Sequence, residues 1–459
     1  MKVRNSMTNF IQSIIDWFKL KFGVRIEDKT SNELMTDFEE VDGISITATL
    51  SERLASLSLS DSGIAITGNN ARAEYIGSFA GKFYKTRLDD IAQVCLGTGD
   101  CIAKPNTDGH KFGIDVIKNS DFRIVSSIGD LITAVLIRCD TFKSNNELYE
   151  RWEYHKLEEI DTTVVSSIYQ VCFKDGKEVP ISDVPQWSSI QEYQYVPNVD
   201  RLLIGRFKCP KLNRRDVNSP NGVPITYGAD EIVIAAKESW RRFNQEFSDK
   251  ESMIFADKTL FKTRIDTVIN PDGSTSTAKR DYMPRGKERL IKQVNANKSI
   301  DGQPLIHDYS PAIRDASLDS GIERNLRMLE MFCGLSEGIL SKSTLTYTNT
   351  DEVKKSTQAT FAFITKFRNT IEQGVNDLLY AIDMICNANG ITPMGEWSAV
   401  YEWSDTYVQS MAERFNELMQ GQAVGVIGKD EFRSWLTGES IDQAKEWVEQ
   451  NKGIDLINE

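Results

Sequence analysis

Histidine and paired cysteine are scarce in this sequence. Its 459 residues include three histidines, His110, His155 and His307, and seven cysteines that are scattered without a C-x-x-C pair. Zinc sites are built from closely spaced cysteine and histidine ligands, and that spacing is missing here. The pattern predicts reduced, mostly buried thiols in a cytosolic chain that holds no metal or other cofactor.

A nucleotide-binding loop is also missing. The nearest match, GSFAGKF at residues 77–83, has one residue too few between its glycines. It places Phe83 where a magnesium-binding Ser or Thr is needed, and it lies in a helical pattern instead of after a strand. The GTGD stretch at 97–100 is typical of a turn from helix to strand. Adjacent carboxylates in EEVDG and KLEEID are common on solvated faces, so no enzyme is expected.

No run of residues is apolar enough to span a bilayer. The N-terminal stretch MTNFIQSIIDWFKLKFGV is amphipathic but short, and it lacks the small-residue cleavage site of a signal peptide. We expect residues 1–27 to form a docking helix in preference to a membrane-surface anchor, in a soluble protein made inside the cell.

The chain as a whole has fewer basic than acidic residues. The formal net charge is −13 and the pI is near 5.0, which argues against a free-standing nucleic-acid-binding protein. Residues 257–298 nevertheless carry ten Lys/Arg against five Asp/Glu, whereas residues 396–459 carry five against thirteen. The basic stretch is either a solvated hairpin and helix face or a surface for nucleic acid or an acidic partner.

Apolar spacing divides the first half of the chain. Repeated three- and four-residue steps predict helix over residues 50–93, and after GTGD the period changes to two. We expect a meander of antiparallel strands over 101–173, with Asp175-Gly176 in a tight turn. Residues 180–227, rich in Pro, Asn and Gly, are expected to form loops and short strands.

Helical spacing returns in the second half. It predicts a helix from Ala229, another from Leu318 to Phe332 that stops near Gly334, and one of more than thirty residues ending at NANG. Asn349, with Glu352 three residues on, is a plausible N-cap for this long helix. A strand at 397–403 and two or three short acidic helices complete an α+β chain.

The order of these segments is similar to that of the portal proteins of tailed bacteriophages, of the type found in phages and prophages of Gram-positive bacteria. The likeness covers nearly the whole chain. It includes RRFNQEFSDKESMIF, YSPAIRDASLDSGIERNLRMLEMFCGLSEGILS and VYEWSDTY. Its most specific parts are the junction of GLSEGILS with the long helix and the strand end EWSDT. The resemblance implies a ring-forming subunit with a helical stem and crown, an antiparallel β-rich wing and a small mixed clip.

The resemblance also implies a division of the chain. The segments are an N-terminal amphipathic helix (1–27), the wing (28–225), a stem helix (226–254), the clip (255–309), a second stem helix (310–335), the tunnel loop (336–350), a long helix (351–388), a wing return strand (389–409) and crown-like acidic helices (410–459). In this family, twelve copies form a ring at one capsid vertex of the virion, assembled in the bacterial host cytoplasm. Double-stranded DNA is packaged and ejected through the ring.

The tunnel loop is the segment that the resemblance places against moving DNA. Its expected DNA-facing residues are Ser341, Lys342, Ser343, Thr344, Thr346, Tyr347, Thr348 and Asn349. Hydroxyl and amide groups bond weakly to phosphate, whereas many Lys or Arg side chains would release counterions and hold the duplex. The loop has few large apolar anchors, so we expect it to be mobile and to project into the channel.

The clip is the segment expected to contact other proteins. Its expected partner residues are Arg280, Arg285, Lys287, Arg289 and Lys292. The implied partners are the terminase packaging motor, a head-completion or adaptor protein, and the major capsid and scaffolding proteins. Two alternatives remain open: another structural protein of the phage head, such as a minor capsid protein, and, more remotely, a packaging ATPase or nuclease.

Overall fold

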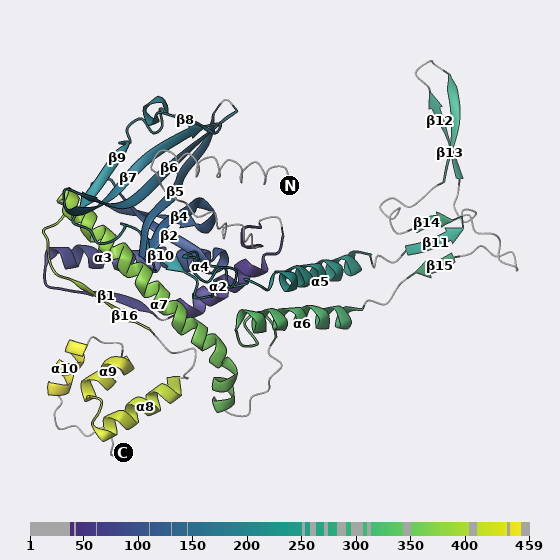
Figure 1. The fold of residues 1–459 in the computed structure, drawn as a ribbon. Coiled ribbons are helices and arrows are strands. Elements are labelled where there is room, and N and C mark those ends of the chain that lie inside the picture. Colours follow the sequence, from purple (N-terminus) through teal and green to yellow (C-terminus); the bar gives the residue numbers. More distant parts are fainter. Residues whose placement is uncertain are drawn as a thin grey trace. The chain divides into compact units, whose positions relative to one another are not determined.

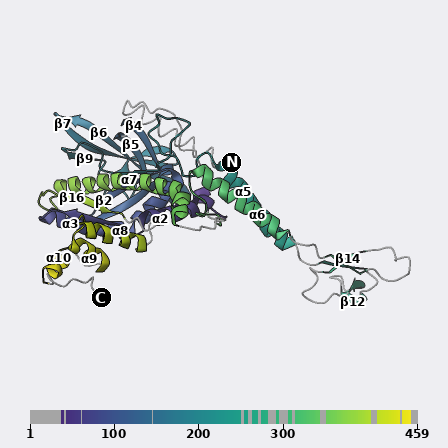
Figure 2. The ribbon, with the colours of Figure 1, turned by 90° about the horizontal axis from the view of Figure 1, so that it is seen from below.

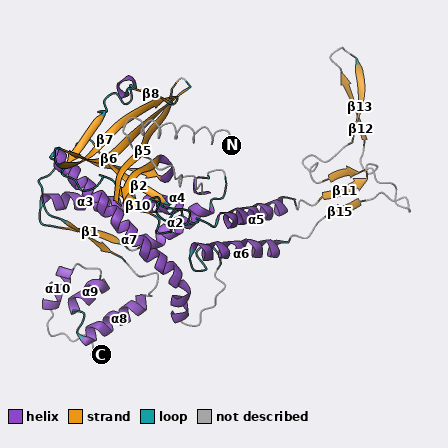
Figure 3. Cartoon of the chain, viewed as in Figure 1, coloured by secondary structure: helices purple, strands orange, loops and turns teal. Residues whose placement is uncertain are grey.

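The computed structural model describes residues 37–40, 43–60, 62–109, 111–129, 131–144, 146–249, 253–257, 263–269, 274–281, 291–294, 306–309, 314–342, 350–403, 411–437 and 441–450. Helices and mostly antiparallel strands are mixed within these ranges (Figure 3), which confirms the α+β class. The docking helix expected at residues 1–27 lies outside them. Within the described ranges, no helix combines the length and apolar character needed to cross a bilayer.

The chain divides into two compact units. The first combines residues 1–227, 331–339 and 344–459, and the second combines residues 228–330 and 340–343. The chain passes from one unit to the other four times, so both units are built from discontinuous segments.

The first unit begins with helices and one short strand. Their bounds are η2 (Asp37–Glu39), α2 (Ile46–Leu59), β1 (Gly63–Thr67), α3 (Ala71–Thr86) and α4 (Leu88–Thr98). The prediction of unbroken helix over residues 50–93 is therefore wrong, because β1 interrupts it. β1 pairs antiparallel with β16 (Ser398–Glu402), and Ser398 lies 331 residues after its partner Thr67. A strand whose partner is so distant carries little local signal.

The ends of these helices follow from local side-chain chemistry. Ser45 caps α2 by accepting a hydrogen bond from the amide of Ala48, and Asn70 caps α3 in the same way. α4 ends at Gly99, whose φ of 92° is a conformation that glycine adopts without strain. The GTGD stretch is thus a helix-to-strand turn, as predicted, and GSFAGKF lies inside α3.

The described strands that follow form two antiparallel sheets in the first unit. The smaller has the order β10-β2-β3, and the larger has the order β4-β5-β6-β7-β8, with β9 also paired to β7. Their bounds are β2 (Asp100–Thr107), β3 (Phe112–Lys118), β4 (Phe122–Ile128), β5 (Leu131–Ser144), β6 (Glu147–Ile160), β7 (Thr163–Lys174), β8 (Lys177–Val179), β9 (Tyr193–Pro197) and β10 (Gly205–Lys208), with single turns η3 (Asn119–Asp121) and η4 (Ile181–Asp183).

The antiparallel meander is therefore confirmed. Asp175-Gly176 forms a two-residue turn, where both residues have positive φ and Lys174 pairs with Lys177, as the sequence predicts. One apolar cluster joins the two sheets. It includes Ile102 from β2 and Val135 from β5, both fully buried.

α7 (Thr350–Asn389) is the long helix of the first unit and lies across β10 (Figure 1). Ile364, Phe367, Ile371 and Val375 form part of its buried stripe. Its length and its end before Gly390 agree with the prediction, whereas its proposed cap at Asn349 lies outside the described residues. The acidic helices α8 (Met411–Val424), α9 (Lys429–Thr437) and α10 (Ile441–Gln450) follow, as predicted.

The second unit consists of two helices with a β segment inserted between them. α5 (Asp230–Asp249) and α6 (Asp315–Cys333) lie side by side in two perpendicular views (Figures 1 and 2). Arg314 forms a two-pronged ion pair with Glu246 of α5, at 2.8 and 3.1 Å. Asn325 of α6 donates to Ser239 of α5 at 3.0 Å. The last turn of α6, from Met331, is assigned to the first unit.

The described strands of the inserted segment are β11 (Met253–Asp257), β12 (Thr263–Ile269), β13 (Thr275–Asp281), β14 (Ile291–Val294) and β15 (Ile306–Tyr309). β12 and β13 form the hairpin predicted around NPDGST. β11 lies between β14, which is parallel to it, and β15, which is antiparallel. The parallel pair was not anticipated, since its two strands are joined by a long connection instead of a turn.

Candidate functional site

The segment after α6, which the sequence predicts to be a polar loop, begins with buried residues. The amide of Ser336 donates to Thr360 Oγ1 at 2.9 Å, and the amide of Thr360 donates to Ser336 Oγ at 3.3 Å. Both side chains are buried, as is Ile339, whose carbonyl oxygen accepts a hydrogen bond from Arg53. Residues 336–339 are therefore held to α7 and α2 within the first unit.

The next three residues are held by carboxylates of α6 within the second unit. Glu330 is fully buried, and its Oε1 accepts hydrogen bonds from the amides of Leu340 and Ser341. Its Oε2 accepts the hydroxyl of Ser341 at 2.7 Å. The amide of Lys342 donates to Glu323 Oε2 at 2.9 Å, and its ammonium group lies 3.5 Å from Asp319 Oδ2.

The start of the loop therefore differs from the prediction. Ser341 is 6% exposed and its hydroxyl is bonded to Glu330, so an exposed, DNA-facing hydroxyl is wrong for this residue. The polar sequence pattern did not predict this burial, because a serine hydroxyl can bond equally well to water and to a buried carboxylate. The Lys342 side chain is 74% exposed and remains a candidate for DNA contact. The other predicted loop residues, Ser343, Thr344, Thr346, Tyr347, Thr348 and Asn349, lie outside the described residues.

The predicted clip contacts are only partly placed. Arg280 lies on β13 and Lys292 on β14, whereas Arg285, Lys287 and Arg289 lie outside the described residues. Arg280 is directly opposite Arg264 in the β12–β13 register.

Large apolar side chains are exposed along α5 and α6. The exposed fractions are 58% for Ile234 and 41% for Trp240 on α5, and 38% for Met328 on α6. Trp240 stacks on Phe243 with ring centroids 6.0 Å apart. Amphipathic helices normally turn such residues inward, so these surfaces are suited to contact with another protein.

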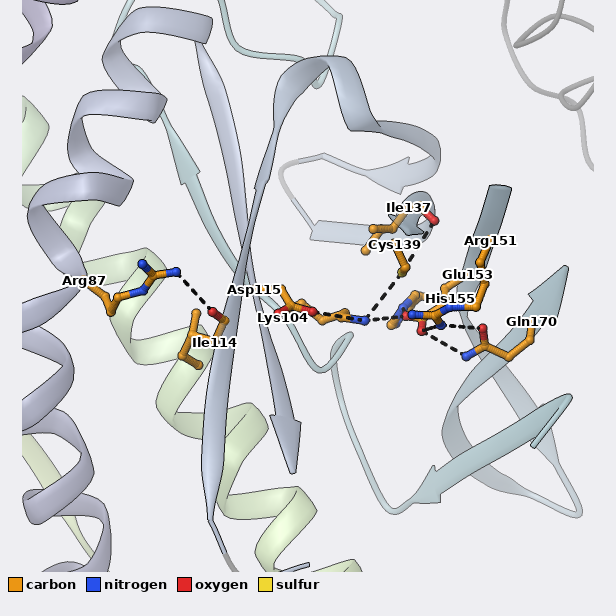
Figure 4. Close-up of polar contacts among 10 residues, drawn as sticks. All are labelled: Arg87, Lys104, Ile114, Asp115, Ile137, Cys139, Arg151, Glu153, His155 and Gln170. Atoms are coloured by element: carbon orange, nitrogen blue, oxygen red, sulfur yellow. Dashed lines mark hydrogen bonds and ion pairs between the residues drawn. The ribbon is translucent and has the colours of Figure 1, made fainter. Parts of the chain in front are cut away.

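A buried polar cluster lies between the two sheets of the first unit (Figure 4). Lys104 of β2 reaches across to Glu153 of β6, with Nζ 2.9 Å from Oε2, and lies 3.5 Å from the sulfur of Cys139. Glu153 also accepts hydrogen bonds from His155 at 3.0 Å, and from Arg151 and Gln170. Arg87 and Ile114 in Figure 4 form a separate contact.

The protonation states of this cluster favour a structural role. Burial alone raises the pKa of Glu153, but the His155 hydrogen bond and the Lys104 charge hold it well below its ordinary value. Burial lowers the pKa of Lys104, but Cys139 and Glu153 outweigh it and raise this pKa overall. Burial raises the pKa of Cys139 to about 12. A charged Lys104 and a protonated Cys139 are poor nucleophiles, so the cluster serves as an ionic link between the sheets.

The sequence pattern did not predict this ionic link between Lys104 and Glu153. Arg151, Glu153 and His155 alternate on β6, a pattern that normally predicts a solvated face, but the strand is buried on both sides. Six of the seven cysteines are buried, in agreement with the sequence prediction, and Cys139 is partly exposed. Among the described residues, no three or more His, Cys, Asp or Glu side chains are grouped for a metal ion.

No protein-family model matches the chain, and no curated protein sequence is significantly similar to it.

Proposed function

We propose that this protein is a phage portal subunit, which forms a ring at one capsid vertex for DNA packaging and ejection. The order of its elements supports the proposal. A helix–strand wing precedes α5, an inserted β segment lies between α5 and α6, and a polar loop leads from α6 into the 40-residue helix α7. This is the order that the resemblance to portal proteins implies.

The observation that carries the proposal is the exposed apolar surface of α5 and α6. Ile234, Trp240 and Met328 lie on the two helices that correspond to the stem, where neighbouring subunits of a ring would cover them. A contact between different faces of identical subunits gives a ring when the rotation between neighbours closes, and an open filament when it does not. A ring of twelve subunits is the proposed assembly.

The charge distribution is compatible with a DNA channel. A subunit with a net charge of −13 repels the phosphate backbone, which reduces binding as the duplex moves past. The exposed ammonium group of Lys342 is paired with Asp319 and Glu323, so it adds little net positive charge near the loop. The basic clip is the proposed docking surface for the terminase motor and the head-completion protein, and the wing and crown are proposed to meet the capsid and scaffold.

Electron microscopy of the purified, negatively stained protein, together with mass photometry, tests this function. We expect rings with a central hole, of about twelve subunits. Trp240→Glu should shift the population to monomers and small oligomers, because a charge cannot be buried in an apolar contact without large cost. Asn244→Glu, at an exposed position on the same helix, is the matched control and should leave rings intact. Folded wild-type protein that remains monomeric or dimeric would overturn the proposal.

A further inference from the structure

We propose that residues 340–342 form a fixed base docked on α6, and that Glu330 is the residue that positions it. Three consecutive backbone amides, of Leu340, Ser341 and Lys342, all donate to carboxylates of this one helix. Consecutive amides that point to one side form a concave site for an anion. Here the helix itself supplies the anionic groups.

The acceptors are arranged as a ladder along one face of α6. Asp319, Glu323 and Glu330 are separated by four and seven residues, which places them on one stripe of an α-helix. Ser341 bonds to Glu330, whereas Lys342 bonds to Glu323 and Asp319, about two and three turns earlier. The chain after α6 therefore runs back along the helix, and Ser341 and Lys342 are each bonded at a defined position along it.

Glu330 contributes most to this contact because it is buried and both of its carboxylate oxygens accept hydrogen bonds. It is 0% exposed, and its two oxygens accept three hydrogen bonds from residues 340 and 341. A buried carboxylate without such partners would be costly, and amides that lose a buried acceptor are costly as well. Each side of the contact thus requires the other, so residues 340–342 should move with α6 as one body.

This inference rests on the proposed function in one respect: the loop is taken to meet DNA. If so, α6 sets the position from which the chain continues to residue 343. Glu330 then affects DNA movement indirectly, by holding Ser341, and without touching DNA itself.

The first test measures the docking itself in the full-length ring. Glu330→Met keeps the length of the side chain but removes both acceptors, whereas Glu330→Gln keeps one acceptor for the amides and can donate to Ser341 Oγ. We expect amide hydrogen exchange at Leu340 and Ser341 to become at least about tenfold faster in Glu330→Met. It should stay within about threefold of wild type in Glu330→Gln, since the acceptor for both amides remains.

Trypsin cleavage after Lys342, measured by mass spectrometry, should be faster in Glu330→Met than in wild type and close to wild type in Glu330→Gln. Glu337→Gln removes an exposed carboxylate of the same segment and should change neither reading. Equal exchange and cleavage in wild type and Glu330→Met would overturn the fixed base. If Glu330→Met does not fold, Ser341→Ala removes the hydroxyl contact alone. It should speed cleavage about threefold, and an unchanged rate would likewise overturn the proposal.

The second test measures positioning. In rings of normal size, Glu330→Met should lower the rate of DNA packaging, and Glu330→Gln should restore it. Normal packaging by Glu330→Met with a released base would overturn the positioning role. Failure of the proposed function is distinguishable, because wild-type protein would then form no ring or pass no DNA while the exchange result stayed valid.

Discussion

At the scale of single residues, Glu150 shows how burial makes stability depend on pH. It is 4% exposed on β6, and its nearest positive group, Arg138, lies 3.9 Å away. Burial raises the pKa of Glu150 to about 7, although the charge of Arg138 opposes the shift. Between pH 4.5 and about 7, the folded protein therefore keeps a proton that the unfolded chain has released. The stability associated with this proton is fully present below pH 4.5 and is lost as the pH rises through about 7.

We therefore expect Glu150→Gln to be more stable than wild type at pH 8, because it removes a buried charge. Its unfolding free energy should also fall less steeply than that of wild type between pH 5 and pH 8. Urea unfolding followed by circular dichroism at several pH values measures both effects. Glu159→Gln, at an exposed position on the same strand, should keep the wild-type slope. A slope in Glu150→Gln equal to that of wild type would contradict this account.

At the scale of secondary-structure elements, a glycine determines how closely α7 approaches β10. A Cβ atom at Gly374 would lie 2.6 Å from the carbonyl oxygen of Arg206 and 2.6 Å from the ring of Phe207. Glycine inside a helix normally costs about 1 kcal/mol relative to alanine, so its presence in α7 needs a packing reason. The close contact with β10 is that reason.

Gly374→Ala should consequently destabilise the fold by about 1–3 kcal/mol, since the added methyl group meets backbone that cannot move aside cheaply. Gly81, inside α3, has open space around it. Gly81→Ala should stabilise by about 0.5–1 kcal/mol through helix propensity alone. If packing determines the effect at Gly374, thermal or urea unfolding should show opposite changes in stability for Gly374→Ala and Gly81→Ala. A stabilising Gly374→Ala would show that α7 and β10 are not in tight contact.

At the scale of the whole molecule, charge is divided between segments. Residues 257–298 carry a net charge of +5, from ten basic and five acidic residues, and residues 396–459 carry −8, from five and thirteen. The proposed clip is therefore suited to protein docking, and the acidic C-terminal helices are unsuited to holding DNA.

Charge reversal in the clip tests this assignment. In a variant carrying both Arg285→Glu and Arg289→Glu, we expect rings of normal size but weaker docking of the packaging motor. Surface charge steers association more than it stabilises the fold. Lys366→Glu, an exposed position on α7, is a control for the change in charge. Surface plasmon resonance with immobilised rings would measure the affinity. Failed ring assembly together with unchanged motor binding would instead make these residues contacts between subunits.

The sequence by itself determined the elements whose causes lie within a few residues. The Asp175-Gly176 turn, the end of α4 at Gly99, the long apolar stripe of α7 and the β12–β13 hairpin were all predictable, because capping, turn geometry and periodicity are local. Only the tertiary structure decided the pairing of β1 with β16 and the parallel pairing of β11 with β14. It also decided the burial of Ser341 against Glu330. These contacts join residues that no period or turn connects, and a short polar or apolar stretch has the same pattern whether water or a distant partner finally covers it.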